Sequence, residues 1–433
     1  MLADTDRGVP AGLRTRIVVE PPRPVALSVL PAEEPARAQA VSVGSGIPEE
    51  LLRRYGARVR QTHRRANVVV LEVPADRQEP RLRELAAAGV VARAPKPVYP
   101  LLNESVPSLA VPAVWRSGFL GSGTRIAIVD TGADHHPDFA DRIAAARDFT
   151  GGRGLDDVGH GTHVAGIVGG AGTLYRGVAP KATLVVAKAL AMGGGTEDTV
   201  LAALSWASRQ NVDVINLSLG GPGDPTDPLS REVDALSAEG ILVCVAAGNS
   251  GPGAGTIGSP GCAAGAITVG ATDKLRHIAE YSSRGPVPGL PAHKPDLVAI
   301  GGGTTAGAAC RYGDGVASAR ARALEKDRCI VPPRYVRMSG TSMAAPHVTG
   351  VCALLVEASR AKDKRAAKAT RARAVRRALL QSAGDLGLAP DVAGAGIVDG
   401  ARALAVLASR RSAAVETSTS SSIAMARRGT DPK

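Results

Sequence analysis

The sequence has few aromatic residues and no long apolar run. Phe, Trp and Tyr make up 3% of the 433 residues. No run of 18 apolar residues occurs, so the sequence predicts no membrane-spanning helix and no membrane partner. The segment Met1–Leu13 contains charges, Gly and Pro but no apolar core of a secretory signal. A cytoplasmic location is therefore the default expectation.

Cysteine is also scarce. The five cysteines are odd in number, and no two of them have the spacing of a metal site. The sequence therefore predicts no metal centre. Without an export signal, free thiols are favoured over a disulfide framework, although two of the cysteines could bridge a loop. The cysteines are Cys244, Cys262, Cys310, Cys329 and Cys352, and the two that could form the bridge are Cys310 and Cys329.

Acidic residues are outnumbered by basic ones, and the net charge is +12. A basic protein can favour nucleic acid, anionic membranes or acidic substrates. The excess lies mainly in residues 360–377 and in the C-terminal tail. No aromatic residue is interleaved there to stack on bases, so a solvated helix face is favoured over nucleic-acid binding. A basic nucleic-acid-binding protein is an alternative supported by charge alone.

Residues 1–103 are predicted to form a small α/β domain. Short apolar segments that read as strands alternate there with segments that read as helices. The expected strands are 16–20, 40–43, 67–73 and 90–92, and the expected helices are 48–59 and 79–88.

Residues 104–408 are predicted to form a larger α/β domain. Apolar strands without polar alternation, separated by helices, indicate a parallel sheet that is buried on both faces. Ligands bind to such sheets beyond the carboxyl ends of the strands. The tail 409–433 is rich in Ser, Thr and Arg and is expected to be disordered. The expected strands are 125–129, 183–187, 212–217, 241–246 and 266–269, and the helices include 163–168, 196–209 and 230–238.

A serine stands at the start of a predicted buried helix. Gly340 and Thr341 permit a sharp turn before Ser342, and Pro346 falls in the first helical turns, where its missing N–H costs little. Backbone N–H groups and the helix dipole at this position suit a developing oxyanion. The alternative is that Ser342 is only an N-cap.

Three further polar residues follow predicted strands or begin a helix. Asp130 follows an apolar strand, His160 begins a glycine-flanked helix, and Asn249 follows another strand between glycines. Taken singly, Asp130 could cap a turn and Asn249 could be a turn asparagine, while His163 on the same helix as His160 is expected to be packed. Taken together with the serine, they fit acyl transfer: a nucleophile, a base, an orienting carboxylate and an oxyanion donor.

These segments resemble the motifs of the subtilisin-like serine peptidases (subtilases). They are Asp130-Thr131-Gly132, HGTHVAG at 160–166 and GTSMAAPH at 340–347. The resemblance implies a three-layer fold with a mostly parallel central sheet. It also implies a monomeric serine endopeptidase that acts on polypeptides, with Asp130, His160 and Ser342 as the triad and Asn249 in the oxyanion hole. Since family members are commonly exported, secretion is the alternative location.

The N-terminal domain resembles, more weakly, the inhibitory propeptide of the family. Residues 1–103 would then inhibit the enzyme within the precursor, with residues 93–103 lying in the groove as a product-like strand. No cofactor is expected. Calcium is possible but not supported, because residues 167–176 lack the ligands of the family's strong calcium loop and Asp138 alone cannot bind it tightly.

The resemblance also implies a substrate groove in which the substrate pairs as an added strand. The segments around its first pocket hold small, uncharged residues, so an apolar side chain is expected before the cut bond. The alternative is that the glycines serve only turns. The residues implied in substrate binding are Ser218, Leu219, Gly220, Ala247, Gly248 and Gly258.

Two departures from the family pattern stand out. Ile300 occupies a position where proline is usual, and the segment of residues 302–337 is longer than a minimal subtilase needs.

The other function class left open is a catalytically inactive peptide-binding protein on the same fold, which a broken triad would favour.

Overall fold

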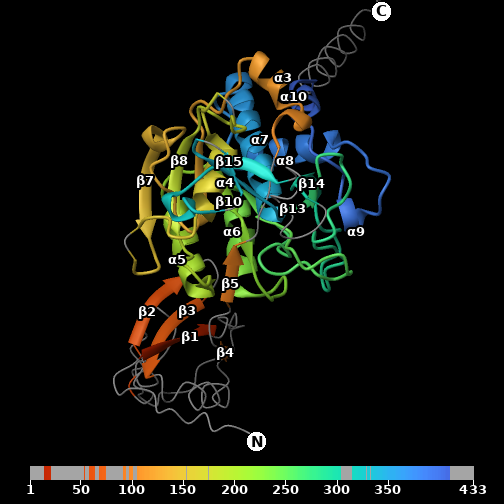
Figure 1. The fold of residues 1–433 in the computed structure, drawn as a ribbon. Coiled ribbons are helices and arrows are strands. Elements are labelled where there is room, and N and C mark those ends of the chain that lie inside the picture. The colour runs from red at the N-terminus through yellow and green to blue at the C-terminus, as the bar shows by residue number, and fades with distance from the viewer. Residues whose placement is uncertain are drawn as a thin grey trace, which may run out of the picture.

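The computed structural model describes two parts of the chain (Figure 1). In the N-terminal part it describes five strands, at residues 14–20, 58–63, 68–74, 91–93 and 97–100, together with Arg53. In the remainder it describes residues 105–409, except 153, 174, 304–314, 328 and 332. The predicted strand 40–43, the predicted helix 79–88 and the tail beyond residue 409 lie outside the described residues.

The N-terminal strands form a four-stranded antiparallel sheet with the order β2-β3-β1-β4. Its strands are β1 (Arg14–Glu20), β2 (Arg58–His63), β3 (Val68–Pro74) and β4 (Val91–Arg93). Three of the predicted strands are thereby confirmed. The predicted helix 48–59 was wrong at its end, because residues 58–59 belong to β2. That prediction ran through Gly56, a residue type that commonly ends helices.

The larger part is built on a seven-stranded sheet with the order β14-β13-β12-β10-β6-β8-β7, in which all neighbours are parallel. All five predicted strands are present, and two edge strands were missed. β7 is half exposed and ends in charged residues, and β14 is only four residues long, so neither has a strong apolar signal. The strands are β6 (Arg125–Asp130), β7 (Ile143–Asp148), β8 (Thr183–Lys188), β10 (Val214–Leu217), β12 (Leu242–Ala246), β13 (Ile267–Thr272) and β14 (Leu297–Ile300).

Helices cover both faces of this sheet and make a three-layer α/β fold (Figure 1). Side chains alternate along β6, so that Ile126 and Ile128 pack with α4 (His160–Gly169) and α7 (Thr341–Lys362). Ala127 and Val129 pack on the opposite face with α5 (Glu197–Ser208) and α6 (Pro228–Ala238). The two cores hold the carboxyl ends of the strands in fixed positions. No helix among the described residues is long and apolar enough to cross a bilayer.

The C-terminal helices complete the layer around α7. They are α8 (Lys368–Ser382), α9 (Pro390–Ala393) and α10 (Gly400–Ser409), and α3 (Val111–Arg116) packs near α10. Part of the basic stretch 360–377 is bonded to the protein rather than solvated. Arg360 pairs with Asp213 at 2.5 Å, and Arg376 pairs with Asp296 at 2.9 Å. Those positive charges therefore hold helices to the sheet.

The long segment before α7 forms a small sheet that backs α4. Its strands are β15 (Val316–Ala319), β16 (Ile330–Val331) and β17 (Tyr335–Met338), in the antiparallel order β15-β17-β16. Ser318 Oγ donates to the His163 carbonyl at 2.7 Å, and His163 Nε2 lies 3.1 Å from the Val316 carbonyl. Burial lowers the pKa of His163 to about 3. His163 is thus the packed histidine that the sequence predicted.

The cysteines are mostly free. Cys244, Cys262 and Cys352 are buried free thiols, as predicted. Cys329, one of the two cysteines that the sequence named for a possible bridge, is disulfide-bonded. The segment 302–337 therefore carries a cross-link that the sequence had left open.

Candidate active site

The carboxyl end of β6 and the start of α4 bring Asp130 and His160 together. Asp130 Oδ1 lies 2.5 Å from His160 Nδ1 and accepts the Thr131 N–H at 2.7 Å. Asp130 is fully buried and His160 is 2% exposed. This carboxylate orients the His160 ring and fixes the tautomer that carries the proton on Nδ1.

A second buried carboxylate holds these two segments in place. Asp156 accepts Thr131 Oγ1 at 2.8 Å, the Gly159 N–H at 2.7 Å and the Thr162 N–H at 2.8 Å. Burial raises the pKa of Asp156, against the effect of these donors. A Cβ at Gly161 would lie 2.0 Å from the Gly132 carbonyl oxygen, so only glycine lets the two segments approach. The sequence analysis missed Asp156; the signal that could have found it is an acid four residues before His160, ahead of the predicted helix.

Ser342 lies in the first turn of α7, fully buried. Gly340, with φ +149°, is the N-cap residue, so the alternative that Ser342 is only an N-cap was wrong. Ser342 Oγ donates to the Ser218 carbonyl at 3.1 Å, and Ser218 Oγ donates to the Ser342 carbonyl at 2.8 Å. The two serines are thus joined in both directions.

Asn249 is oriented by the residue before Ser342. Its Oδ1 accepts the Thr341 N–H at 2.8 Å and the Thr341 hydroxyl at 3.0 Å. Thr341 Oγ1 in turn accepts the Gly248 N–H at 3.2 Å. Because Oδ1 is used in this way, the Nδ2 group is the part of the amide left to donate into the adjoining cavity.

This cavity has a volume of about 480 Å³ and lies beside Asn249. Of the six residues implied in substrate binding, Gly220, Ala247, Gly248 and Gly258 line it. Ser218 and Leu219 do not line it and are buried beside it. A Cβ at Gly258 would lie 2.2 Å from the Gly221 carbonyl oxygen, which fixes glycine there. None of the described residues that line the cavity is charged; the others are Gly221, Pro222, Gly223, Ala246, Asn249, Ser250, Gly255, Thr256 and Ile257.

A strand of the chain itself lies next to this cavity. β5 (Pro97–Pro100) pairs antiparallel with β11 (Leu219–Gly220) on one side and with β9 (Gly195–Thr196) on the other. Tyr99 pairs with Gly220, and Pro100 pairs with Leu219. Figure 1 shows β5 between the N-terminal sheet and the larger part of the chain. β11 thus pairs through its main chain with an extended segment of the same chain.

Comparison with known proteins agrees with these motifs. The model of the Subtilase family matches residues 121–403. The chain belongs to the subtilase family.

Three relatives illustrate the extent of the similarity. Serine protease AprX of Bacillus subtilis (strain 168) is 36% identical over 292 residues, which cover 60% of this chain and 63% of AprX. An intracellular serine protease of Paenibacillus polymyxa is 35% identical over 278 residues, 61% of this chain and 76% of the relative. Subtilisin Savinase of Lederbergia lenta is 36% identical over 249 residues, which cover 56% of this chain and 80% of the relative. The chain thus spans less than two thirds of AprX.

Asp138, which was considered as a calcium ligand by resemblance, is bonded within the protein. The Tyr335 hydroxyl donates to Asp138 Oδ2 at 3.1 Å. Arg142 donates to three carbonyl oxygens, of Ala182 at 3.0 Å and of Asp138 and Gly169 at 2.5 Å. Among the described residues, no three His, Cys, Asp or Glu side chains are grouped to hold a metal ion.

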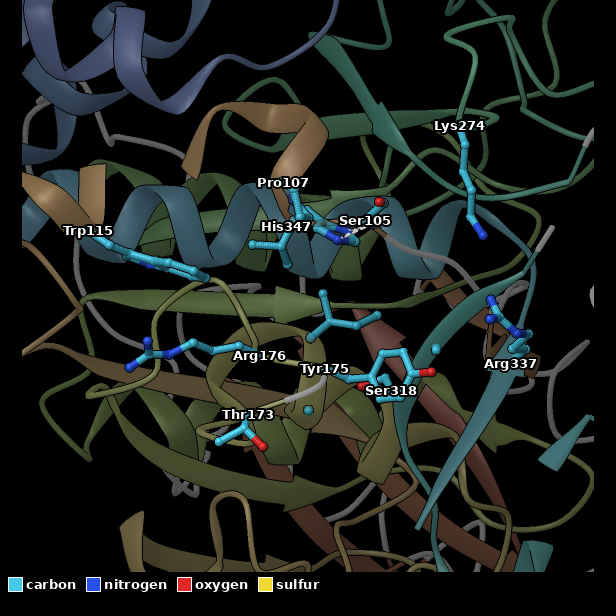
Figure 2. A pocket seen from close by; sticks show the side chains of 14 residues that line it. Ser105, Pro107, Trp115, Thr173, Tyr175, Arg176, Lys274, Ser318, Arg337 and His347 are labelled. Carbon is cyan, nitrogen blue, oxygen red and sulfur yellow. Dashed lines mark hydrogen bonds between the residues drawn. The ribbon is translucent and has the colours of Figure 1, made fainter. Parts of the chain in front are cut away.

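A second cavity of this subtilase lies along α7 (Figure 2). Its volume is about 600 Å³, and it includes none of the residues predicted for the active site. His347 and Ser105 lie on one wall, and the Ser105 N–H donates to His347 Nε2. Burial lowers the pKa of His347 to about 3, so its ring is neutral.

Proposed function

We propose that this subtilase is a serine endopeptidase that cuts peptide bonds through an acyl-enzyme. The observation that supports it most directly is the 2.5 Å contact between Asp130 Oδ1 and His160 Nδ1, at the same sheet edge as Ser342. In this proposal His160 Nε2 removes the proton of Ser342 Oγ, and Asp130 stabilises the imidazolium. Turnover by His160→Ala or Ser342→Ala should fall by several orders of magnitude, and the double variant should be little worse.

The oxyanion of the tetrahedral intermediate would be held by two donors. One is Asn249 Nδ2, and the other is the backbone N–H of Ser342, in the first turn of α7, where N–H groups have no acceptor within the helix. Ser342 Oγ must first leave the Ser218 carbonyl. A substrate N–H that pairs with Ser218 in the added strand would take over that acceptor and release the hydroxyl.

We further propose that the chain is a precursor inhibited by its own N-terminal domain. β5 occupies the position of an added strand on β11, and β2 lies beside α5, so the domain would cover the groove. The mature enzyme is proposed to act as a monomer on polypeptides with an apolar residue before the cut bond. A cytoplasmic location, with secretion as the alternative, stays a prediction.

A fluorophosphonate probe tests the proposal. It reacts with an activated serine, so we expect labelling of mature protein at Ser342 and none in Ser342→Ala. A matched control is Ser250→Ala, because Ser250 lines the same cavity but has no base beside it. Absence of labelling in a folded mature protein would favour the catalytically inactive peptide-binding alternative.

A further inference from the structure

The second cavity lies downstream of the groove strand along the chain. Pro100 pairs with β11, whereas Ser105 lines the cavity and bonds to His347. Five residue steps span at most about 17 Å. If β5 marks where a substrate lies before the cut bond, the cavity is within reach of the residues after that bond. This step rests on the proposed function.

Positive side chains surround this cavity. Figure 2 shows Lys274 and Arg337 pointing toward one another at one end. Arg176 lies at the other end, with its guanidinium 5.1 Å from the Trp115 ring centroid. None of the described lining residues is Asp or Glu. The lining residues are Ser105, Val106, Pro107, Trp115, Gly166, Ile167, Thr173, Tyr175, Arg176, Lys274, Ala317, Ser318, Arg337 and His347.

We propose that this cavity selects substrates that carry Asp or Glu about three to five residues after the cut bond. Lys274 and Arg337 supply charge, and the hydroxyls of Thr173, Tyr175 and Ser318 can donate to a carboxylate. The chain's own sequence has Glu104 immediately before Ser105. The uncharged cavity of about 480 Å³ would thus bind a side chain before the cut bond, and this cationic cavity would bind a side chain after it.

Matched peptides test this selectivity. Each has Leu before the cut bond and either Glu, Gln or Lys at the third position after it. In wild type, kcat/KM should be at least ~3-fold higher for Glu than for Gln, the range of a partly exposed ion pair, and lower for Lys. Adding 1 M salt should reduce the Glu preference, because it screens the charges.

Variants then assign the preference to the cavity. In Lys274→Ala and Arg337→Gln the Glu-to-Gln ratio should approach 1, while cleavage of the Gln peptide is retained. Arg337→Gln keeps a polar side chain without the charge, although it is too short to retain the bond of 2.9 Å from Arg337 to the Gly315 carbonyl. Arg209→Ala, a change on an exposed helix end, is the charge-matched control and should keep the ratio. Equal cleavage of all three peptides by wild type would overturn this inference alone, whereas no cleavage of any would count against the proposed function.

A second inference comes from Pro346 in the first turns of α7. The Ser342 carbonyl would normally accept the N–H of residue 346, but proline has none. Ser218 Oγ supplies the missing donor at 2.8 Å. Ser218 is itself held, because Asn216 Nδ2 donates to its Oγ at 2.9 Å and Thr349 Oγ1 donates to Asn216 Oδ1 at 2.8 Å. All of these polar side chains are fully buried.

We infer that Asn216 is a positioning residue for the nucleophile and acts through Ser218. Ser218 directly precedes β11, the strand that pairs with the peptide. The bond from Ser218 Oγ to the Ser342 carbonyl therefore fixes the distance between the nucleophile and the peptide backbone. Losing it should lower kcat more than it raises KM.

A double-mutant cycle tests this coupling. Ser218→Ala should lower kcat by about tenfold in the wild-type background, because the Ser342 carbonyl loses its donor. In a Pro346→Ala background, residue 346 regains an N–H, and the same change should cost less than about threefold. An equal cost in both backgrounds would overturn the inference.

Asn216→Ala provides an independent arm in case Ser218→Ala fails to fold. Its loss of kcat should also be smaller in the Pro346→Ala background. A merely structural role would lower the unfolding temperature without this rescue of kcat. Ser230→Ala is the control, since Ser230 is equally buried but bonds away from α7.

Discussion

The Thr341 N–H and hydroxyl both donate to Asn249 Oδ1, at 2.8 and 3.0 Å. The residue next to the proposed nucleophile, Ser342, therefore orients the proposed oxyanion donor. Asn249→Ala should lower kcat by a factor on the order of 10²–10³, as for the corresponding asparagine of subtilisin, with a smaller change in KM. Steady-state kinetics on a peptide substrate would measure both constants.

Thr341→Val separates orientation from donation. It keeps the backbone N–H bond but removes the hydroxyl, so kcat should fall by only about tenfold or less. The Asn249→Ala, Thr341→Val double variant should be close to Asn249→Ala alone, because the hydroxyl acts through the amide. Additive losses would contradict this arrangement.

The register of β5 predicts the bond that is cut on maturation. Tyr99 pairs with Gly220 and Pro100 with Leu219, so a peptide bound in this register would have its next residue opposite Ser218. The Ser218 carbonyl is the acceptor of Ser342 Oγ. The first cut should therefore fall between Leu101 and Leu102, and N-terminal sequencing of the mature protein should begin at or after Leu102.

Three variants serve as checks on this cut. Ser342→Ala should stay at 44.0 kDa. Leu101→Met should mature, whereas Leu101→Asp should mature slowly, because its carboxylate would enter an uncharged cavity. A mature N-terminus before residue 98 would show that β5 is not the product-like strand.

The uncharged cavity beside Asn249 predicts selectivity before the cut bond. Burying an unpaired Arg or Lys there is costly, so Leu, Met or Phe should dominate cleavage of a peptide library. Ser250 is exposed and lines the cavity. Ser250→Glu should raise kcat/KM for Arg or Lys by several-fold, with Ser250→Gln as the neutral control. A library dominated by Arg or Lys with the unaltered protein would refute the prediction.

Some of these features could be predicted from the sequence, and others could not. Asp130 and Asn249 follow strong apolar strands, so the parallel-sheet rule predicts their positions beyond the carboxyl ends of the strands, whereas His160 and Ser342 were assigned as the first residues of helices that begin after glycines. Asp156 and Arg142 could not be found in this way, because each has partners in segments distant in the sequence: the Thr131 hydroxyl for Asp156, and the Gly169 and Ala182 carbonyls for Arg142. β7 was missed because an edge strand is half solvated and lacks a continuous apolar run.

The roles proposed for the site residues stay predictions, as do the domain boundaries. The family resemblance implied Ser218 and Leu219 in substrate binding as part of the strand-pairing segment, and both side chains are buried and do not line the cavity. The residues of β11 and Ser218 just before it pair through their backbone, and a sequence pattern does not show which way the side chains of such a segment face.

Arg142 predicts stability without a bound metal. Its guanidinium bonds the carbonyls of Asp138, Gly169 and Ala182, and Gly169 is the last residue of α4. We propose that the Arg142 guanidinium stabilises the loop after α4 in the way that a bound metal ion would. Arg142→Ala should lower the free energy of unfolding by about 2–4 kcal/mol, because charge-assisted bonds to buried carbonyls are lost.

Thermal inactivation with and without excess EDTA would measure this. The unaltered protein should have the same half-life in both, and Arg142→Ala a much shorter half-life in both. Arg142→Lys should be intermediate, since one ammonium cannot reproduce the planar fork of donors. A large loss of stability in EDTA alone would point to a metal site and contradict this proposal.

His163 and His347 predict that stability falls as the pH is lowered. Burial lowers the pKa of both to about 3, against an ordinary value near 6.5. Between these values the unfolded chain binds a proton that the folded chain does not, so the free energy of unfolding rises with pH across this window. The slope should approach ~1.4 kcal/mol per pH unit for each histidine. Above pH 7 both are neutral in either state, and the slope should vanish.

Unfolding of Ser342→Ala between pH 7.5 and 4.5 would measure this slope without autolysis. His347→Gln should make the slope shallower, because one of the two buried imidazoles is gone. His277→Gln is the matched control, since the side chain of His277 is 70% exposed. Returning each sample to pH 7.5 before unfolding separates this effect from irreversible damage. A stability that is flat or rising as the pH falls from 6.5 to 5 would mean that His163 and His347 are charged in the folded protein. Their bonds to the Val316 carbonyl and the Ser105 N–H would then need a different assignment.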